Sequence, residues 1–161
     1  MNIEVPDFGE LLAGHIGRIP EASQPAFLSS LERTAADRYR HWAEQLPAHA
    51  ELLLDCAQRE DEIAARVVAM LPASSETDQQ LIDGEIDAAR STYYDAFSGH
   101  TVWEQLYLQS KAERQGAAAW RAYAAAPEYQ SLAEDLEACA RIEEASADAL
   151  DRLLAEFANV C

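Results

Sequence analysis

The sequence predicts an all-α fold, a four-helix bundle of two duplicated helical hairpins joined by a long helical crossover. Three observations lead to this prediction. The chain has 161 residues, of which 49% are hydrophobic and only six are Gly and six Pro, so it can bury one core and has few helix-breaking residues. Apolar residues recur at alternating steps of three and four, the spacing of a buried helix face. Blocks of the first half of the sequence recur in the second half.

The first part of the chain is expected to be an arm followed by two helices. Residues 1–22 contain three Gly and two Pro, so we expect an irregular arm with one short helix around 8–16. The segments on both sides of Pro47 are rich in Ala, Leu, Glu and Arg, which favour helices. Proline is tolerated in the first turn of a helix but ends the helix before it. We therefore expect helices at 24–46 and 48–71.

Capping residues and a second proline divide the rest of the chain. Ser75-x-x-Asp78 and Thr101-x-x-Glu104 fit the capping-box pattern, so helices are expected to begin near these motifs. Pro127 separates the last two helices, as a proline does in the first half. The expected helices are 76–97, 101–126 and 128–158. A single domain over 1–161 then consists of the arm 1–22, the first hairpin 24–71, the crossover 72–100 and the second hairpin 101–158.

The charge of the chain limits its partners. It has 12 Lys and Arg against 29 Asp and Glu, a formal net charge of −17, which repels phosphate backbones and anionic lipid and attracts cations. We expect metal ions as partners, and neither nucleic acid nor a membrane. The sequence starts without the layout of a signal peptide and has no apolar run near the roughly 18 residues of a spanning helix, so a cytoplasmic location is expected. Cys56, Cys139 and Cys161 form no CxxC pair and are expected to be reduced thiols.

Each of the four bundle helices carries one Glu among the apolar residues of its buried face. ERTAADRY begins at Glu32 and matches ERQGAAAW, which begins at Glu113; CAQRE ends at Glu60 and matches CARIE, which ends at Glu143. At 1.5 Å per residue each Glu lies roughly 20 to 24 Å from the proline joint of its own hairpin. A crossover as long as the bundle places the two joints at opposite ends. We therefore predict that the four carboxylates meet near the middle of the core.

Four buried carboxylates require compensation, because moving one unpaired carboxylate out of water costs several kcal/mol. Bound cations, buried Arg or Lys side chains, or protonation can provide it. No Lys or Arg lies on the four buried faces, although Arg38, Arg59 and Arg66 lie one position away and can reach inward. A bound metal is the simplest solution. The alternative is a relic of a metal site, held by protons, water or nearby Arg.

Paired hairpins, a long crossover and one inward Glu per helix resemble the ferritin-like superfamily. The Glu-x6-Tyr block of Glu32 and Tyr39 looks most like its rubrerythrin-type members, and the resemblance covers about 24–158. It implies a site for two iron or manganese ions, in which two helices give one Glu each and two give Glu-x-x-His. The four Glu match, but the two His positions are Ile63 and Ser146. The resemblance also implies a homodimer.

Two functions follow from this resemblance and from the absence of the two His residues. One is a dinuclear iron or manganese protein with a carboxylate-only site, an oxidoreductase or ferroxidase-like protein that reacts with O₂ or peroxide or oxidises Fe²⁺. In it Glu60 and Glu143 bridge the ions, and Glu32 and Glu113 are terminal ligands. The alternative is a degenerate, non-catalytic bundle without metal, which serves as a scaffold or interaction module.

Aromatic and thiol side chains near the four Glu have simpler explanations. Tyr39, seven residues after Glu32, either hydrogen-bonds a Glu or packs as a core aromatic residue. Trp120 is expected only to pack. Cys56 and Cys139 lie one turn from a Glu and are expected to pack as small hydrophobic residues.

Overall fold

The computed structural model describes residues 3–160, and this part of the chain consists of helices joined by short connections, without a strand. This confirms the predicted all-α class. No described helix is both long and apolar enough to cross a membrane. The α-helices of the described part are α1 (Phe8–Ile16), α2 (Gln24–Gln45), α3 (Ala50–Met70), α4 (Glu76–Asp95), α5 (Val102–Ala125) and α6 (Ala133–Val160), and the 3-10 turns are η1 (Glu21–Ser23), η2 (Pro47–His49) and η3 (Pro127–Leu132).

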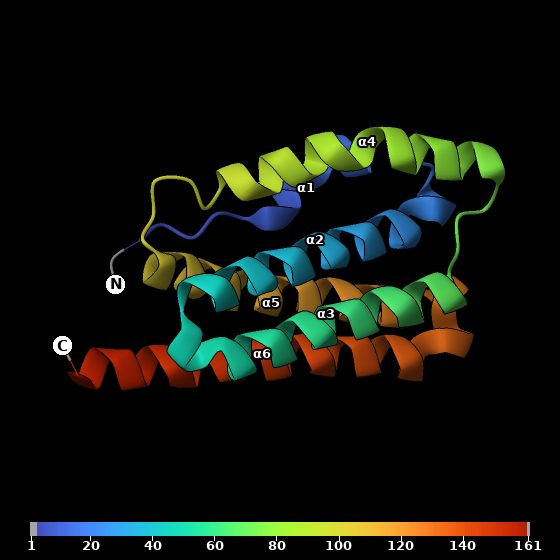
Figure 1. The fold of residues 1–161 in the computed structure, drawn as a ribbon. Coiled ribbons are helices and arrows are strands. Elements are labelled where there is room, and N and C mark those ends of the chain that lie inside the picture. Colours follow the sequence, from blue (N-terminus) through green and yellow to red (C-terminus); the bar gives the residue numbers. More distant parts are fainter. Residues whose placement is uncertain (1–2, 161) are drawn as a thin grey trace.

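The four long helices of the bundle form two pairs. α2 packs along α3 and α5 packs along α6, while α3 and α6 contact each other between the pairs (Figure 1). α4 connects the two pairs and runs along the outside of the bundle, against α1 and α2 (Figure 1). The Pro47 and Pro127 joints therefore lie at opposite ends. The arrangement has the two helix pairs and the crossover that the sequence suggests. That the pairs arose by duplication remains a prediction.

The helix ends follow the prolines and caps, with two differences from expectation. Thr101 and Glu104 form a complete capping box at α5, and Ser75 caps α4 by accepting a hydrogen bond from the backbone N–H of Asp78. α3 and α6 begin two and five residues later than expected, at Ala50 and Ala133. The cause is the same at both joints, because each proline starts a 3-10 turn before the α-helix begins.

The short helix expected in the arm is present as α1, which lies beside α4 (Figure 1) and also contacts α2 and α5. The side chain of Gln115 on α5 holds its start, because it accepts from the Phe8 backbone N–H at 2.8 Å and donates to the Pro6 carbonyl at 3.0 Å. At its other end His15 hydrogen-bonds Glu85 and Thr92 of α4. Met1 and Asn2, at the start of the predicted arm, lie outside the described residues.

Buried polar residues divide the interior into two apolar clusters. On α3, Leu53 and Cys56 belong to the larger cluster and Ile63 and Val67 to the smaller, with Glu60 between them. The same order holds along α5 around Glu113, and the reverse order holds along α6 around Glu143. We call the buried polar residues at this level the polar layer, which consists of Glu60, Gln109, Glu113, Glu143 and Ser146.

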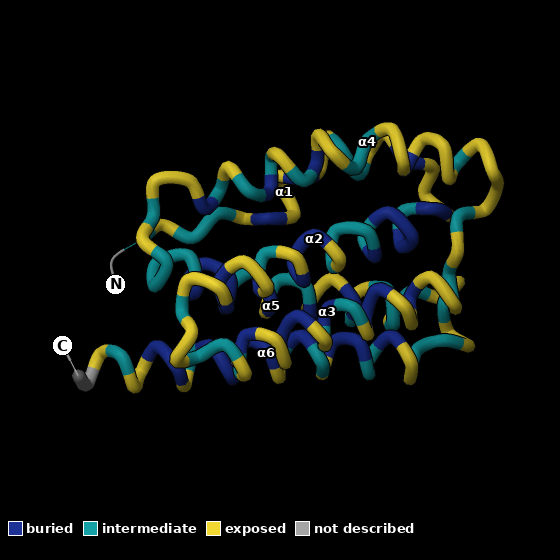
Figure 2. The backbone as a smooth tube through the Cα atoms, viewed as in Figure 1, coloured by how far each residue is buried: buried dark blue, intermediate teal, exposed yellow. Residues whose placement is uncertain are grey.

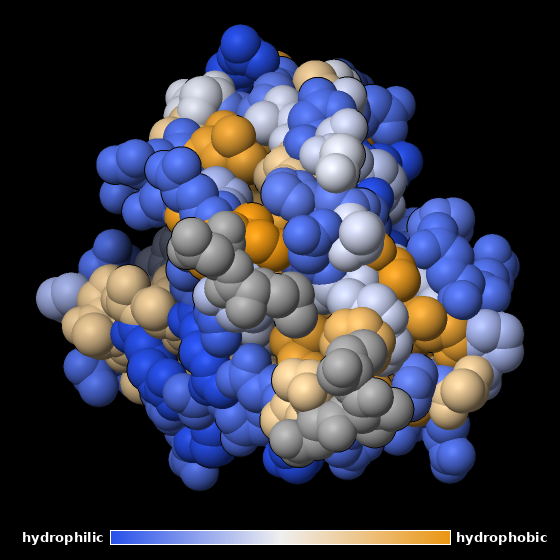
Figure 3. Space-filling model, turned by 90° about the vertical axis from the view of Figure 1, so that its left-hand side faces the viewer, coloured by the Kyte–Doolittle hydropathy of each residue, from blue (hydrophilic) through white to orange (hydrophobic). Residues whose placement is uncertain are grey.

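Outside the core, polar residues dominate the surface. The buried positions of the bundle helices face one another, and exposed positions face outward (Figure 2). Seen end-on, the molecule is mostly hydrophilic, with hydrophobic residues visible only in patches between the helices (Figure 3). The excess of acidic residues is thus carried by the surface, apart from those that the polar layer buries.

Candidate metal centre

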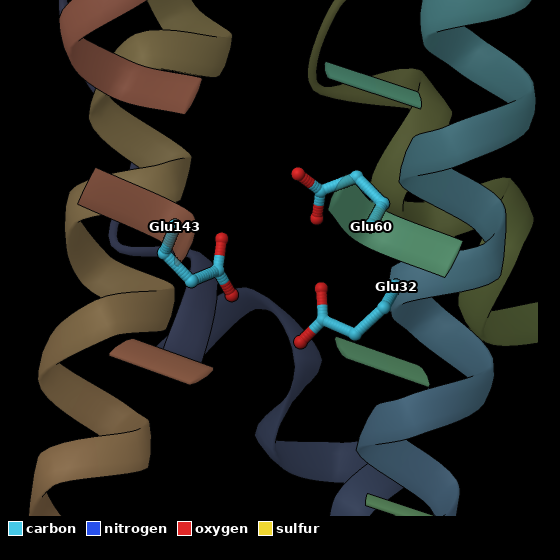
Figure 4. A group of neighbouring side chains, drawn as sticks. All are labelled: Glu32, Glu60 and Glu143. Carbon is cyan, nitrogen blue, oxygen red and sulfur yellow. The ribbon is translucent and has the colours of Figure 1, made fainter. Parts of the chain in front are cut away.

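One Glu from each bundle helix reaches the middle of the bundle. Glu60, Glu113 and Glu143 are at most 2% exposed, and Glu32 is half-buried. The carboxylates of Glu32, Glu60 and Glu143 point toward one another (Figure 4), and one oxygen of each lies within 4.8 Å of the others. Three of the four predicted residues therefore form one compact oxygen cluster, contributed by α2, α3 and α6.

Glu113, the fourth predicted residue, lies beside this cluster and is held by neutral donors. The Tyr39 hydroxyl donates to its Oε1 at 2.7 Å, and the Gln109 side-chain amide donates to the same oxygen at 2.6 Å. Gln109 in turn accepts from the Tyr93 hydroxyl at 2.5 Å. This buried chain fixes one oxygen of Glu113 and leaves the other, Oε2, without a hydrogen-bond partner.

The two aromatic residues that follow the repeated Glu-Arg pairs each donate to a Glu of the other helix pair. Tyr39 of α2 bonds Glu113 of α5, which decides between its two explanations. Trp120 of α5 donates its indole N–H to Glu32 and to Glu143, at 3.2 Å each. The expectation that Trp120 only packs is therefore wrong. Trp120 follows Glu113 by seven residues, as Tyr39 follows Glu32. This shared position in the two matched blocks was the signal that could have identified Trp120 as a donor.

The two positions where the resemblance expects His differ in their surroundings. The Ser146 hydroxyl donates to Glu60 at 3.3 Å, so this position faces the carboxylates, as the Glu-x-x-His spacing implies. Ile63 is fully buried in the smaller apolar cluster. One of the missing imidazoles is therefore replaced by a weak oxygen donor and the other by a hydrocarbon side chain.

Gly116 gives the Glu143 carboxylate its room. A Cβ at this position would lie 2.6 Å from Glu143 Oε1 and 3.0 Å from the carboxyl carbon, closer than packed atoms approach. Gly in the middle of a helix costs roughly 0.5 to 1 kcal/mol relative to Ala. The matching residue of the first pair is Ala35, so this difference within the repeat was a signal that the sequence carried.

Basic side chains do not neutralise the cluster. The ion pairs found among residues 3–160 involve none of the four Glu. Of the three Arg that the sequence placed nearby, Arg66 pairs with Glu62, and Arg59 donates to the Cys56 sulfur at 3.6 Å. Arg38 lies over the aromatic rings of Trp42, Tyr94 and Phe97. Protons and cations remain as the two ways to compensate the buried carboxylates.

Burial shifts these carboxyl groups strongly toward the protonated form. Loss of solvation, followed by the charge of Glu113, raises the pKa of Glu32 to about 8. The pKa of Glu60 and that of Glu143 lie well above the ordinary value for the same causes, desolvation first and the neighbouring carboxylates second. In the metal-free protein the cluster therefore holds protons near neutral pH.

The donor set fits a hard metal ion. Glu60 Oε2 and Glu113 Oε2 are buried without a hydrogen-bond partner, which is an uncommon and costly condition for a carboxylate oxygen. The atoms of this site that can bind a metal are carboxylate and hydroxyl oxygens, the ligands that Mg²⁺, Ca²⁺, Mn²⁺ and iron ions accept. Cys56 does not compete as a ligand, because burial raises the pKa of its thiol to about 12.

The two described thiols have the packing role expected of them. Cys56 and Cys139 are free and fully buried, and burial raises the pKa of Cys139 to about 11. Both stay protonated at neutral pH, which makes them poor nucleophiles. Cys161, the third predicted thiol, lies outside the described residues.

A cavity of about 340 Å³ leads to the carboxylates from the side covered by α1. All four Glu line its inner part, and apolar residues of α1, α2 and α5 form most of its wall. The arm has no hydrophobic periodicity that specifies its path, so this cavity could not be predicted from the sequence.

Neither a family model, nor a curated protein, nor a solved structure matches this chain. The ferritin-like assignment therefore remains a prediction, and the function has to be inferred from the site.

Proposed function

We propose that this chain is a ferritin-like metal-binding protein whose carboxylates hold two iron or manganese ions. The observation that carries the proposal is the oxygen cluster of Glu32, Glu60 and Glu143, buried without a basic partner beside the unpartnered Oε2 of Glu113. A cation satisfies these oxygens and removes the repulsion between the carboxylates. When bound, such ions supply redox chemistry toward O₂ or peroxide.

The residues around the cluster prepare the carboxylates for this task. Tyr39 and Gln109 hold one oxygen of Glu113 and leave the other free to bind. Trp120 holds one oxygen of Glu32 and of Glu143 at the boundary between the helix pairs. The raised pKa values of Glu32, Glu60 and Glu143 keep protons on these three carboxyl groups in the metal-free protein. Metal binding therefore has to release protons and tightens as the pH rises.

Metal titration of the full chain tests the proposal. The protein is loaded anaerobically with Fe²⁺ or Mn²⁺, separated from free metal, and its metal content is measured. We expect two ions per chain, and their loss in the Glu60→Gln, Glu143→Gln double variant. The matched control is the double variant Glu62→Gln, Glu144→Gln. It removes two acids of the same two helices that lie outside the cluster and form ion pairs with Arg66 and Arg121. Equal metal content in both double variants would contradict the proposal.

The second candidate is a ferritin-like scaffold that no longer binds metal, favoured by Ile63 and Ser146 at the His positions. In this case protons alone compensate the carboxylates. The double variant Ile63→His, Ser146→His then binds metal that the parent chain does not bind. A parent chain that already takes up two ions excludes this candidate.

A further inference from the structure

We infer that the cavity beneath α1 binds a largely apolar organic molecule that carries no negative charge and ends in a hydrogen-bond donor at the carboxylates. The inference that this molecule is the substrate of the centre rests on the proposed function. The inference that the molecule binds does not rest on the proposed function, because the cavity and its inner hydrogen-bond acceptors exist without metal. The polarity, shape, size and charge of the cavity support this assignment.

The polarity of the wall changes from one end of the cavity to the other. Leu12 and Ile16 of α1, Leu28 and Leu31 of α2 and the alanines of α5 form an apolar wall over most of its length. The acidic oxygens are confined to the inner end. An apolar passage is a poor route for a hydrated metal ion, which would have to shed its water there. Such a passage suits a molecule whose apolar part stays in contact with the apolar wall.

The cavity opens to solvent between α2 and α5. Ala119 and Ala122 line it and are exposed, and Ile16 and Leu28 on the opposite side are half-buried. The roof is α1, which Gln115 and His15 fasten to the bundle through side-chain hydrogen bonds. A ligand can therefore reach the inner end while α1 stays in place.

The size of the cavity limits the ligand. Benzene occupies an engineered cavity of roughly 150 Å³, which corresponds to roughly 25 Å³ per carbon atom. At this density the 340 Å³ cavity accommodates about 13 non-hydrogen atoms. This is the size of a straight chain of ten to twelve carbons or of a two-ring compound.

The charge of the cavity selects the end group. No Lys or Arg is among the described residues that line it, so a carboxylate or phosphate finds no cationic partner there. Glu60 Oε2 and Glu113 Oε2 are unpartnered acceptors at the inner end. A hydroxyl or ammonium group can donate to them, whereas a carboxylate or phosphate group has no hydrogen to donate.

Calorimetric titration of the full chain, metal-free and metal-loaded, with 1-decanol, decylammonium and decanoate tests this inference. We expect saturable binding of 1-decanol or decylammonium to the metal-free chain, and at least tenfold weaker binding of decanoate. Binding of 1-decanol alone identifies a neutral ligand, and binding of decylammonium alone a cationic one. Equal affinity for all three, or no binding of any, overturns the inference.

Two tryptophan variants locate the binding. Ala119→Trp places a large side chain at the mouth, and the matched control Ala118→Trp places it on the next residue of the same helix, which is exposed and does not line the cavity. We expect Ala119→Trp to weaken binding at least tenfold with its metal content unchanged, and Ala118→Trp to bind as the parent does. Equal affinities in the two variants contradict the assignment. If the chain takes up no metal but still binds 1-decanol, only the proposed metal function fails.

Discussion

In the α2–α3 pair the aromatic residue that follows the first Glu is Tyr39, and in the α5–α6 pair it is Trp120. Each donates to the other pair, but the consequences differ. Glu113 receives two short hydrogen bonds, from Tyr39 and Gln109, whereas Glu32 has only the longer bond from Trp120. Glu113 is almost fully buried and Glu32 is half-buried.

This difference gives the two pairs distinct tasks within one site. The second pair contains Glu113, which two donors hold, and Glu143, for which Gly116 leaves room. The first pair contributes Glu32, which has fewer constraints and borders the cavity. We call the second pair the firm side of the site and the first pair the adjustable side. The following predictions test this contrast, starting with the largest expected effect.

Removing Glu32 is expected to alter the pH dependence of stability. In the metal-free chain Glu32 keeps its proton up to a pKa of about 8, while the unfolded chain loses it near the ordinary value of 4.5. The folded state therefore binds more protons between these values, and the free energy of unfolding falls as the pH rises, by about 1.4 kcal/mol per pH unit for each extra proton. Urea unfolding with EDTA between pH 5 and 8 measures this slope.

The variant Glu32→Gln should flatten that slope by close to one proton. Glu44→Gln is the control, because Glu44 is an exposed acid of the same helix. The same slope in Glu32→Gln and in the parent chain would show that Glu32 does not hold its proton. Glu60 and Glu143, whose pKa values are also raised, should preserve the rest of the slope.

Removing the two aromatic donors should destabilise the chain unequally. Tyr39→Phe deletes one buried hydrogen bond, and Gln109 still donates to Glu113, so we expect a loss of about 1 to 2 kcal/mol. Trp120→Phe deletes the donor that Glu32 and Glu143 share and removes indole volume, so we expect about 2 to 4 kcal/mol. Urea unfolding at one pH measures both. A larger loss for Tyr39→Phe than for Trp120→Phe would show that Gln109 alone does not hold Glu113.

Substitutions at the matched residues Gly116 and Ala35 should change metal affinity and stability independently. In Gly116→Ala the added Cβ displaces the Glu143 carboxylate, and we expect about tenfold weaker metal binding with a stability change below about 1 kcal/mol, because Ala favours the helix. Ala35→Gly should cost about 1 kcal/mol and leave metal binding unchanged. Metal titration and urea unfolding of both variants check this. Unchanged affinity in Gly116→Ala would mean that Glu143 can move without loss.

The sequence predicted the helices and the level of the four Glu because both depend on local rules. Pro47 and Pro127 end helices for steric reasons, and a constant rise per residue carries each Glu an equal distance from its joint. The partners of the Glu depend on side-chain direction across helices, which spacing does not specify. The spacing assigns Gln109 only a position on the buried face, whereas in the structure its amide donates to Glu113.

The cavity was beyond prediction for a different reason. It depends on where α1 lies, and α1 is held by single contacts such as the Gln115 side chain on the backbone of Pro6 and Phe8. Such contacts leave no periodic signal in the sequence. The bundle helices, in contrast, meet through many apolar residues whose spacing repeats.

The polar layer between the two apolar clusters also fixes the axial register of the helices. If one pair slid along the other by a helical turn, roughly 5.4 Å, its carboxylates would face hydrocarbon such as Ile63 or Ala117 and lose the donors that the other pair supplies. Apolar positions alone would tolerate such a slip, because one turn brings the next apolar residue to the same place. We therefore expect the layer to align the bundle whether or not it holds a metal.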